Sequence, residues 1–90
     1  MPASPKTLTA IVRRKVREAL NLAPGFGKTE AMLLELVNEL CGGGVDLQSL
    51  RDAMEWNHVE AFIRSEYDSE AEETLWYITK NGIAKQKSLT

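Results

Sequence analysis

The sequence predicts an α+β domain in which three helices are followed by a two-stranded antiparallel hairpin and a short C-terminal helix. Two observations support this order. Apolar residues recur at helical spacing as far as Trp56, interrupted by two stretches rich in glycine or proline. From Val59 the pattern alternates, and residues 74–78 are almost wholly β-branched or aromatic.

The composition fits one domain with its own core. The chain has 90 residues, 43% of them hydrophobic, so it can bury a modest core without a disulfide or a metal ion. We expect a single domain over residues 1–90 that is flexible at 1–5 and 86–90. The lone Cys41 can form no intrachain disulfide, and no apolar run reaches the about 20 residues of a membrane-spanning helix. The sequence therefore predicts a cytoplasmic protein with no membrane contact.

The first helix is predicted from about Leu8 to Asn21. One face is apolar, and Ser4 or Thr7 can cap its start. Residues 23–27 end it, because proline removes a hydrogen-bond donor and glycine permits a positive φ. We interpret the other face as the basic surface of the protein, because it carries Arg13, Arg14, Lys15 and Arg17.

The second and third helices are predicted from capping residues and glycines. Thr29 can cap a helix that runs to about Leu40 with a broad apolar face, and the glycines at 42–44 stop it. Val45 can add a short edge strand. Asp46 then caps a helix over about residues 47–56. Its outward face would be polar, with Gln48, Ser49, Arg51, Asp52 and Glu55.

The hairpin is predicted from the change of period. Residues 59–67 alternate as a strand does, although the glutamates and alanine there also tolerate a helix. The second strand would cover 74–78, with an acidic tip over 68–73. Thr79 can cap the last short helix, and Gly82 would let that helix start close against the sheet.

Charges of opposite sign are separated along the chain. Residues 1–31 carry six basic side chains and two acids, whereas residues 46–73 carry nine acids and two arginines. The last twelve residues add three lysines and no acid. Such a separation bears on the choice of partner rather than on the fold.

The second predicted strand runs through Trp76 and Tyr77 into residues 78–82, Ile-Thr-Lys-Asn-Gly. Preceded by three helices, this segment resembles the winged helix-turn-helix superfamily, many members of which have an aromatic or aliphatic strand running into a Leu/Ile-Thr-x-x-Gly turn. Residues 62–68 look like the first wing strand. The likeness covers residues 8–85, and the layout is similar to that of short stand-alone winged-helix proteins of bacteria and prophages. The resemblance implies a winged helix.

The resemblance also implies a way of binding double-stranded DNA. In that superfamily the third helix commonly enters the major groove while the wing grips the backbone or minor groove. Gln48, Ser49 and Arg51 would then be the readers, since Gln can pair an adenine edge and Arg a guanine edge. The basic residues that would add affinity for phosphates are Arg13, Arg14, Arg17 and Lys80.

The acids of the third helix and wing oppose this docking, because they would repel phosphates. Nucleic acid could instead meet the basic first helix, Lys80 and the lysines of the tail. The alternative is a protein-interaction winged helix that does not bind DNA, since a fold does not fix a function. Its acidic wing would dock on a basic protein partner through Glu66, Asp68, Glu70, Glu72 and Glu73. For DNA binding a homodimer would matter, because duplicated half-sites raise a weak affinity.

We predict no catalytic residues, metal site or cofactor. Residues 25–29, Gly-Phe-Gly-Lys-Thr, end like a phosphate-binding loop, but Leu22 stands where its first glycine should be and the preceding segment is helical. His58 and Cys41 lie in different elements, without zinc-ligand number or spacing. Four aromatic residues can stack on bases, but small cores commonly use aromatics and we assign them to the core: Trp56, Phe62, Trp76 and Tyr77.

Overall fold

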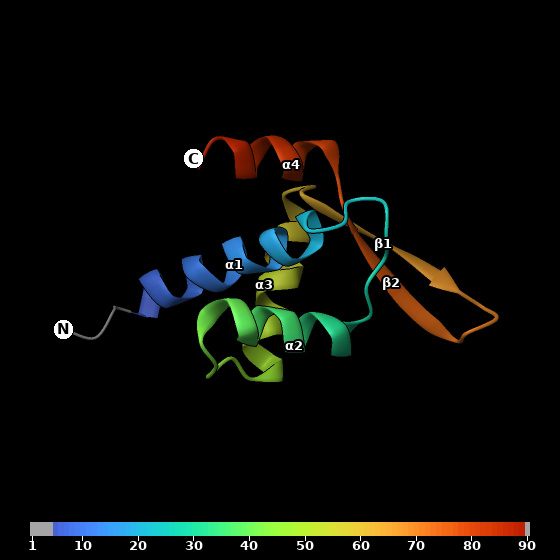
Figure 1. Ribbon diagram of the computed structural model, residues 1–90, viewed down its shortest axis with the longest axis horizontal. Helices are drawn as coiled ribbons and strands as arrows, with labels where there is room; N and C mark the ends of the chain where they lie inside the picture. Colours follow the sequence, from blue (N-terminus) through green and yellow to red (C-terminus); the bar gives the residue numbers. More distant parts are fainter. Residues whose placement is uncertain (1–4, 90) are drawn as a thin grey trace.

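The computed structural model describes residues 5–89, with side chains from Leu8 onward. Over this range the order of elements is α1 (Pro5–Asn21), α2 (Glu30–Cys41), α3 (Leu47–Val59), β1 (Ile63–Asp68), β2 (Glu73–Ile78) and α4 (Lys80–Lys87). Figure 1 shows the helices gathered at one end and the hairpin projecting at the other. The α+β class is as predicted. Ser4 and the side chain of Thr7, the expected caps of the first helix, lie outside the described residues.

α1 is the central helix, because α2, α3 and α4 all contact it. Its residues Val16, Ala19 and Leu20 are fully buried. Side chains from α2, α3 and the base of the hairpin complete a single hydrophobic core: Leu33, Val37, Leu50, Ala53, Met54, Ile63 and Ile78. The inner face of α3 is therefore held against α1, although 25 residues (22–46) separate the two helices in the sequence.

The predicted caps of α2 and α3 are confirmed. Thr29 Oγ1 accepts a hydrogen bond from the Met32 amide at 3.2 Å, and Asp46 Oδ1 accepts one from the Ser49 amide at 2.7 Å. Gly42 ends α2 with a φ of 82°, in the left-handed region that glycine adopts without strain. These local signals fix where both helices begin and where the first of them ends.

The turn between α2 and α3 is held by a side chain rather than by a strand. Asn38 donates from Nδ2 to the Leu34 and Val45 carbonyls and accepts at Oδ1 from the Val45 amide, at 2.9, 3.0 and 2.8 Å. Because both backbone groups of Val45 are bound by one amide, no strand forms there. The predicted edge strand at Val45 is wrong.

The start of the first wing strand also differs from the prediction. α3 continues to Val59 rather than ending near Trp56, and β1 begins only at Ile63. Between them Ala61 adopts a φ of 62°, and the Phe62 amide donates to the Asn57 carbonyl at 2.9 Å. The chain therefore turns sharply over residues 60–62, so the predicted strand over 59–62 is wrong.

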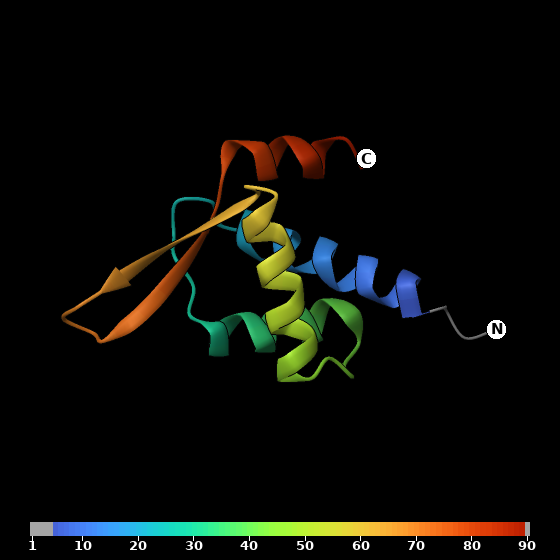
Figure 2. The same cartoon turned by 180° about the vertical axis from the view of Figure 1, so that it is seen from behind.

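The hairpin is antiparallel, with Ile63 opposite Ile78 at its base and Asp68 opposite Glu73 at its outer end. Lys28 extends this sheet beside β2, because its amide and carbonyl both bond Trp76, at 3.0 and 2.9 Å. Figure 2 shows from behind that the tip stands clear of all four helices. The hairpin is thus anchored to the core at one end and surrounded by solvent at the other.

α4 closes the fold as the sequence predicts. Thr79 Oγ1 accepts a hydrogen bond from the Gly82 amide at 3.0 Å and donates one to the Ala61 carbonyl at 2.7 Å. A Cβ at Gly82 would overlap the Phe62 carbonyl oxygen and lie 2.7 Å from Ile78 Cγ1. The predicted cap and the close approach of this helix to the sheet are both confirmed.

Candidate nucleic-acid interface

α3 presents a polar face to solvent. Its inward side chains Leu50, Ala53 and Met54 are buried in the core. Asp46 caps the first turn of this helix and is itself exposed. The exposed residues of the helix are Leu47, Gln48, Ser49, Arg51, Asp52, Glu55, His58 and Val59. The three predicted readers, Gln48, Ser49 and Arg51, therefore share one accessible surface.

Two of these readers are held by neighbouring acids. Gln48 Nε2 donates to Asp52 Oδ1 at 2.8 Å. Arg51 donates from Nε and Nη2 to the two carboxylate oxygens of Glu30, each at 3.0 Å. The hydrogen bonds from Arg51 lower the pKa of Glu30, and the same contact raises the pKa of Arg51. The pair is open to solvent, so it is weak and separable.

The wing is acidic beyond its base. Arg64 pairs with Glu66 at 2.7 Å, and its guanidinium lies 4.4 Å from the centre of the Tyr77 ring. Farther out, Asp68 Oδ1 accepts hydrogen bonds from the amides of Glu70 and Ala71, at 3.0 and 3.2 Å. Glu70, Glu72 and Glu73 are exposed at the end of the hairpin. A wing of this charge does not favour contact with phosphates.

Arg17 does not lie on the solvent-exposed face of α1, and its predicted place there is wrong. The residue is only 2% exposed. Its Nη1 donates to Asn57 Oδ1 at 2.9 Å and its Nε to Gln86 Oε1 at 2.8 Å, while the guanidinium lies 5.4 Å from the Phe62 ring centre. Burial, together with the nearby charge of Arg14, lowers the pKa of Arg17. Arg17 thus joins α1 to α3 and α4.

The other predicted basic residues lie in different surroundings. Arg13 is half-buried, with its guanidinium 4.5 Å from the centre of the Trp56 ring of α3. Arg14 and Lys80 are exposed, on α1 and at the start of α4. Since Arg13 contacts the last turns of α3 and Arg51 contacts the start of α2, these two cations stand on different sides of α3.

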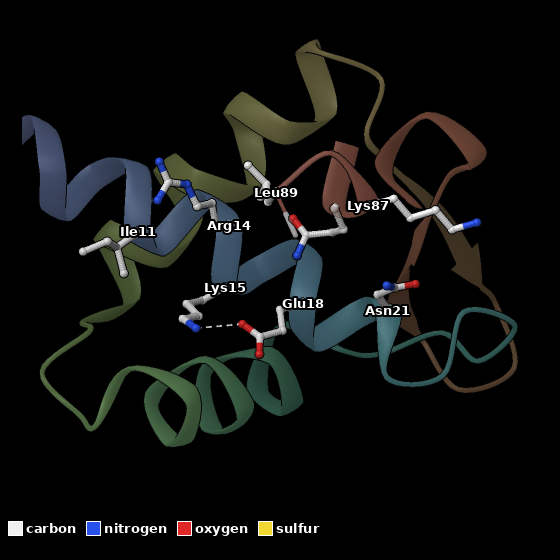
Figure 3. A pocket seen from close by; sticks show the side chains of 8 residues that line it. Ile11, Arg14, Lys15, Glu18, Asn21, Lys87 and Leu89 are labelled. Carbon is white, nitrogen blue, oxygen red and sulfur yellow. Dashed lines mark hydrogen bonds and ion pairs between the residues drawn. The ribbon is translucent and has the colours of Figure 1, made fainter. Parts of the chain in front are cut away.

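α1 and the C-terminal segment flank an open hollow on the surface that the sequence did not single out. It has a volume of about 800 Å³ and is lined by Ile11, Arg14, Lys15, Glu18, Asn21, Gln86, Lys87 and Leu89. Figure 3 shows Lys15 and Glu18 paired along α1, at 2.8 Å, with Leu89 and Lys87 arriving from the C-terminal segment. The sequence feature that bears on this hollow is the end of the chain, which carries lysines and no acid. The sequence does not show that this end packs beside α1.

The aromatic residues are partly buried against neighbouring elements. Trp56 and Phe62 have ring centres 5.9 Å apart, and His58 meets Trp76 edge to face at 5.7 Å. Trp76 also packs against the hydrophobic core. The predicted core role is therefore confirmed for Trp76, whereas Trp56, Phe62 and Tyr77 pack against neighbouring side chains without joining that core cluster.

Within residues 5–89, no three or more His, Cys, Asp or Glu side chains gather as a metal ion would need. The same stretch contains no helix with both the length and the hydropathy required to traverse a bilayer. Cys41 is half-buried, and that burial raises the pKa of its thiol.

The sequence matches no protein-family profile and no curated protein. Solved structures do match the fold. A transcriptional regulator from Clostridium thermocellum gives a TM-score of 0.77 at 17% identity, over 97% of this chain and 84% of that one.

A MarR-family transcriptional regulator from Silicibacter pomeroyi gives 0.73 at 19% identity, over 93% of this chain and 54% of that one. F-93 of SSV1 gives 0.60 at 20% identity, over 90% and 83% of the two chains. This chain therefore spans about half the length of the MarR-family protein. The agreement with these regulators, together with the capped α2–α3 pair and the projecting hairpin, shows that the chain has the winged helix-turn-helix fold predicted from Ile78–Gly82.

Proposed function

We propose that this protein is a small, non-enzymatic, cytoplasmic DNA-binding regulator of transcription, of bacterial or phage type. The observation that carries the proposal is the exposed polar face of α3, which the capped turn after α2 presents to solvent. A helix presented in this way fits the major groove of B-DNA. The transcriptional regulators that share the fold support the proposal through the likeness of their folds.

Each reader has a distinct role in this proposal. Gln48 would pair an adenine edge and Arg51 a guanine edge, with Ser49 bonding to a base or a phosphate. Arg51 would first leave Glu30, which costs little because the pair is solvated. Glu30 thereby acts as a competitor that DNA must displace, so a site with guanine at that position is favoured over non-specific duplex.

Contacts to phosphates would come from Arg13, Arg14 and Lys80, because Arg17 is buried. The acids of α3 and the wing oppose them, so a single copy would bind weakly and with a strong dependence on salt. A homodimer on two half-sites would offset this weakness through the higher effective concentration of the second half-site.

The test is a titration of the protein with a mixed-sequence duplex pool at low and high salt, followed by selection of the tightest sequences. We expect binding at low salt that weakens as salt rises. Gln48→Ala with Arg51→Ala should cost about 1–3 kcal/mol per base contact and relax the selected sequence, whereas Arg14→Glu with Lys80→Glu should weaken all sequences alike and reduce the salt dependence.

The matched control is Glu35→Ala with Glu39→Ala, on the exposed face of α2. This pair removes two side chains, as the reader variant does, and should leave the selected sequence unchanged. If the native protein binds no duplex at low salt, the proposal fails.

A second candidate is a protein-interaction module that does not bind DNA. It is favoured by the exposure of Glu70, Glu72 and Glu73 at the end of a projecting hairpin, beyond the single pairing of Arg64 with Glu66. The wing, comprising Glu66, Asp68, Glu70, Glu72 and Glu73, would dock on a basic protein surface. This candidate would be favoured if the protein bound no DNA in the titration and if substitutions in the wing weakened its association with a basic protein.

A further inference from the structure

Two adjoining hollows form one basic groove between α1 and α4. The larger hollow, described above, shares Arg14 and Leu89 with a smaller one of about 190 Å³. The smaller hollow contains no acid among its lining residues, which are Ala10, Arg13, Arg14, Arg17, Trp56, Lys85 and Leu89. In the larger one Glu18 already pairs with Lys15. The basic groove, defined as these two hollows, therefore carries an excess of positive charge.

Two arginines of the basic groove lack an anionic partner among the described residues. Arg17 is 2% exposed, and both of its side-chain hydrogen bonds go to neutral amides, those of Asn57 and Gln86. Arg13 has a buried Nε without a hydrogen-bond partner in the described part of the chain. Positive side chains that lie close together without carboxylates repel one another. An anion at the mouth of this groove would reduce that repulsion and would therefore be bound favourably.

The chain itself carries a matching anionic surface. We define the acidic tip as Asp68, Glu70, Glu72 and Glu73. In the turn, Asp68 Oδ1 accepts hydrogen bonds from the amides of Glu70 and Ala71, and Glu72 has a left-handed φ of 55°. Four carboxylates are thus presented within six residues at the end of a projecting hairpin.

The acidic tip cannot reach the basic groove of its own chain. The groove lies between α1 and α4, toward the end of the molecule where α4 finishes, whereas the hairpin projects at the opposite end (Figures 1 and 2). The described chain is 47 Å long against 26 and 21 Å in the other directions, which keeps the two surfaces apart. Only another molecule can bring a tip to this groove.

We propose that the acidic tip of one copy docks in the basic groove of a second copy. The contact is head to tail, because the two surfaces differ, so each copy can both give a tip and receive one. This association goes beyond DNA binding and does not depend on it. The contact is small and led by exposed charges, so the complex is weak and its strength falls as salt screens the charges.

Sedimentation equilibrium over a range of protein concentrations tests the contact. At about 0.01 M ionic strength the screening length is about 30 Å, and at about 1 M it is about 3 Å. We expect the average mass of the native protein to rise above the monomer mass of 10.1 kDa at low salt and to return to it at high salt.

Charge reversal separates this contact from other ways of associating. Arg14→Glu with Lys85→Glu reverses the groove, and Glu70→Lys with Glu73→Lys reverses the tip; all four side chains are exposed, so the fold is retained. Each double variant should weaken association about tenfold or more, because favourable pairs become repulsive. The fourfold variant has the net charge of the native chain and exchanges the two signs, so association should return.

The matched control for net charge is Glu35→Lys with Glu39→Lys on α2. It changes the charge as the tip variant does, but outside both surfaces, and it should still associate. A native protein that stays monomeric at low salt would overturn the proposal. Association that survives reversal of the tip would overturn it too, since that result would assign the contact to other surfaces, as in a two-fold dimer.

Discussion

Asn57 is fully buried, yet its side chain uses both of its polar atoms. Oδ1 accepts from Arg17, and Nδ2 donates to the carbonyls of Arg13 and Ala53, at 3.1 and 2.8 Å. Burying an amide costs free energy unless its hydrogen bonds are replaced within the protein. Because the bonds with Arg17 Nη1 and the Arg13 carbonyl cross from α3 to α1, Asn57 adds a directional link between the two helices to their apolar packing.

We predict that Asn57→Ala lowers the free energy of unfolding by about 3 kcal/mol. The substitution leaves the buried guanidinium of Arg17 without its acceptor and the Arg13 carbonyl without its donor, and unpaired buried groups carry their full desolvation cost. Urea unfolding followed by circular dichroism measures the change.

The control is Gln48→Ala, at an exposed position of the same helix, which should stay within about 0.5 kcal/mol of the native protein. A loss below about 1 kcal/mol for Asn57→Ala would mean that water or a rearranged Arg17 replaces the amide.

Arg17 shows why the buried contacts among α1, α3 and α4 could not be predicted from the sequence. It stands four residues after Arg13 in a basic run, so helical spacing groups it with the solvent-facing arginines. Its partners Asn57 and Gln86 lie 40 and 69 residues away along the chain. Periodicity reports only the angle of a side chain around its own helix, whereas burial here depends on α4 returning over α1.

At the scale of elements, one glycine permits the close approach of α4 to the start of the hairpin. A side chain at Gly82 would collide with the backbone carbonyl of Phe62, and backbone cannot move aside as a flexible side chain can. We predict that Gly82→Ala destabilises the protein by about 1–3 kcal/mol, through strain or outward displacement of α4. The shift in the midpoint of thermal unfolding measures this loss of stability.

Gly25→Ala is the matched control, because a Cβ there meets nothing within 4 Å. Its stability should be unchanged or slightly raised, since alanine restricts the unfolded chain more than glycine. Equal losses at the two positions would point to backbone conformation rather than to the contact with Phe62.

Element boundaries were predictable where one residue decides them locally. Thr29, Asp46 and Thr79 each cap a helix through their own side chain, so the sequence predicts all three starts correctly. The end of α3 is different, because its sharp turn depends on the left-handed Ala61 and on the bond from Thr79 Oγ1 to the Ala61 carbonyl. The alternating pattern of residues 59–62 carries no information about the hydrogen bond from Thr79, which lies 18 residues after Ala61.

Across the whole molecule, the separation of charge seen along the sequence becomes a separation in space. The acidic tip and the basic groove lie at opposite ends of a 47 Å chain. The sequence predicted the two signs and the acidic wing, but not the groove, since that requires α4 to pack beside α1. Two carboxylates at the starts of α2 and α3, Glu30 and Asp46, have a pKa lowered by the contacts that they make in the fold.

We predict that the protein loses stability in acid through these two carboxylates. The hydrogen bonds from Arg51 lower the pKa of Glu30, and the Ser49 amide lowers the pKa of Asp46. A carboxyl group whose folded pKa is depressed binds its proton more readily in the unfolded chain. Its contribution is therefore complete above the ordinary carboxyl pKa, about 4, and is lost as pH falls through the folded value.

Urea midpoints measured from neutral pH down through this range should stay level and then fall. Glu30→Gln should lower the midpoint at neutral pH and make the acid decline shallower, because the glutamine keeps an acceptor for Arg51 but has no charge to lose. Glu35→Gln, on the exposed face of the same helix, should follow the native curve. The urea midpoint of Glu30→Gln falling as steeply with pH as that of the native protein would mean that the pair of Glu30 with Arg51 does not stabilise the arrangement of α2 and α3. Arg51 could then bind a partner without a loss of folding stability.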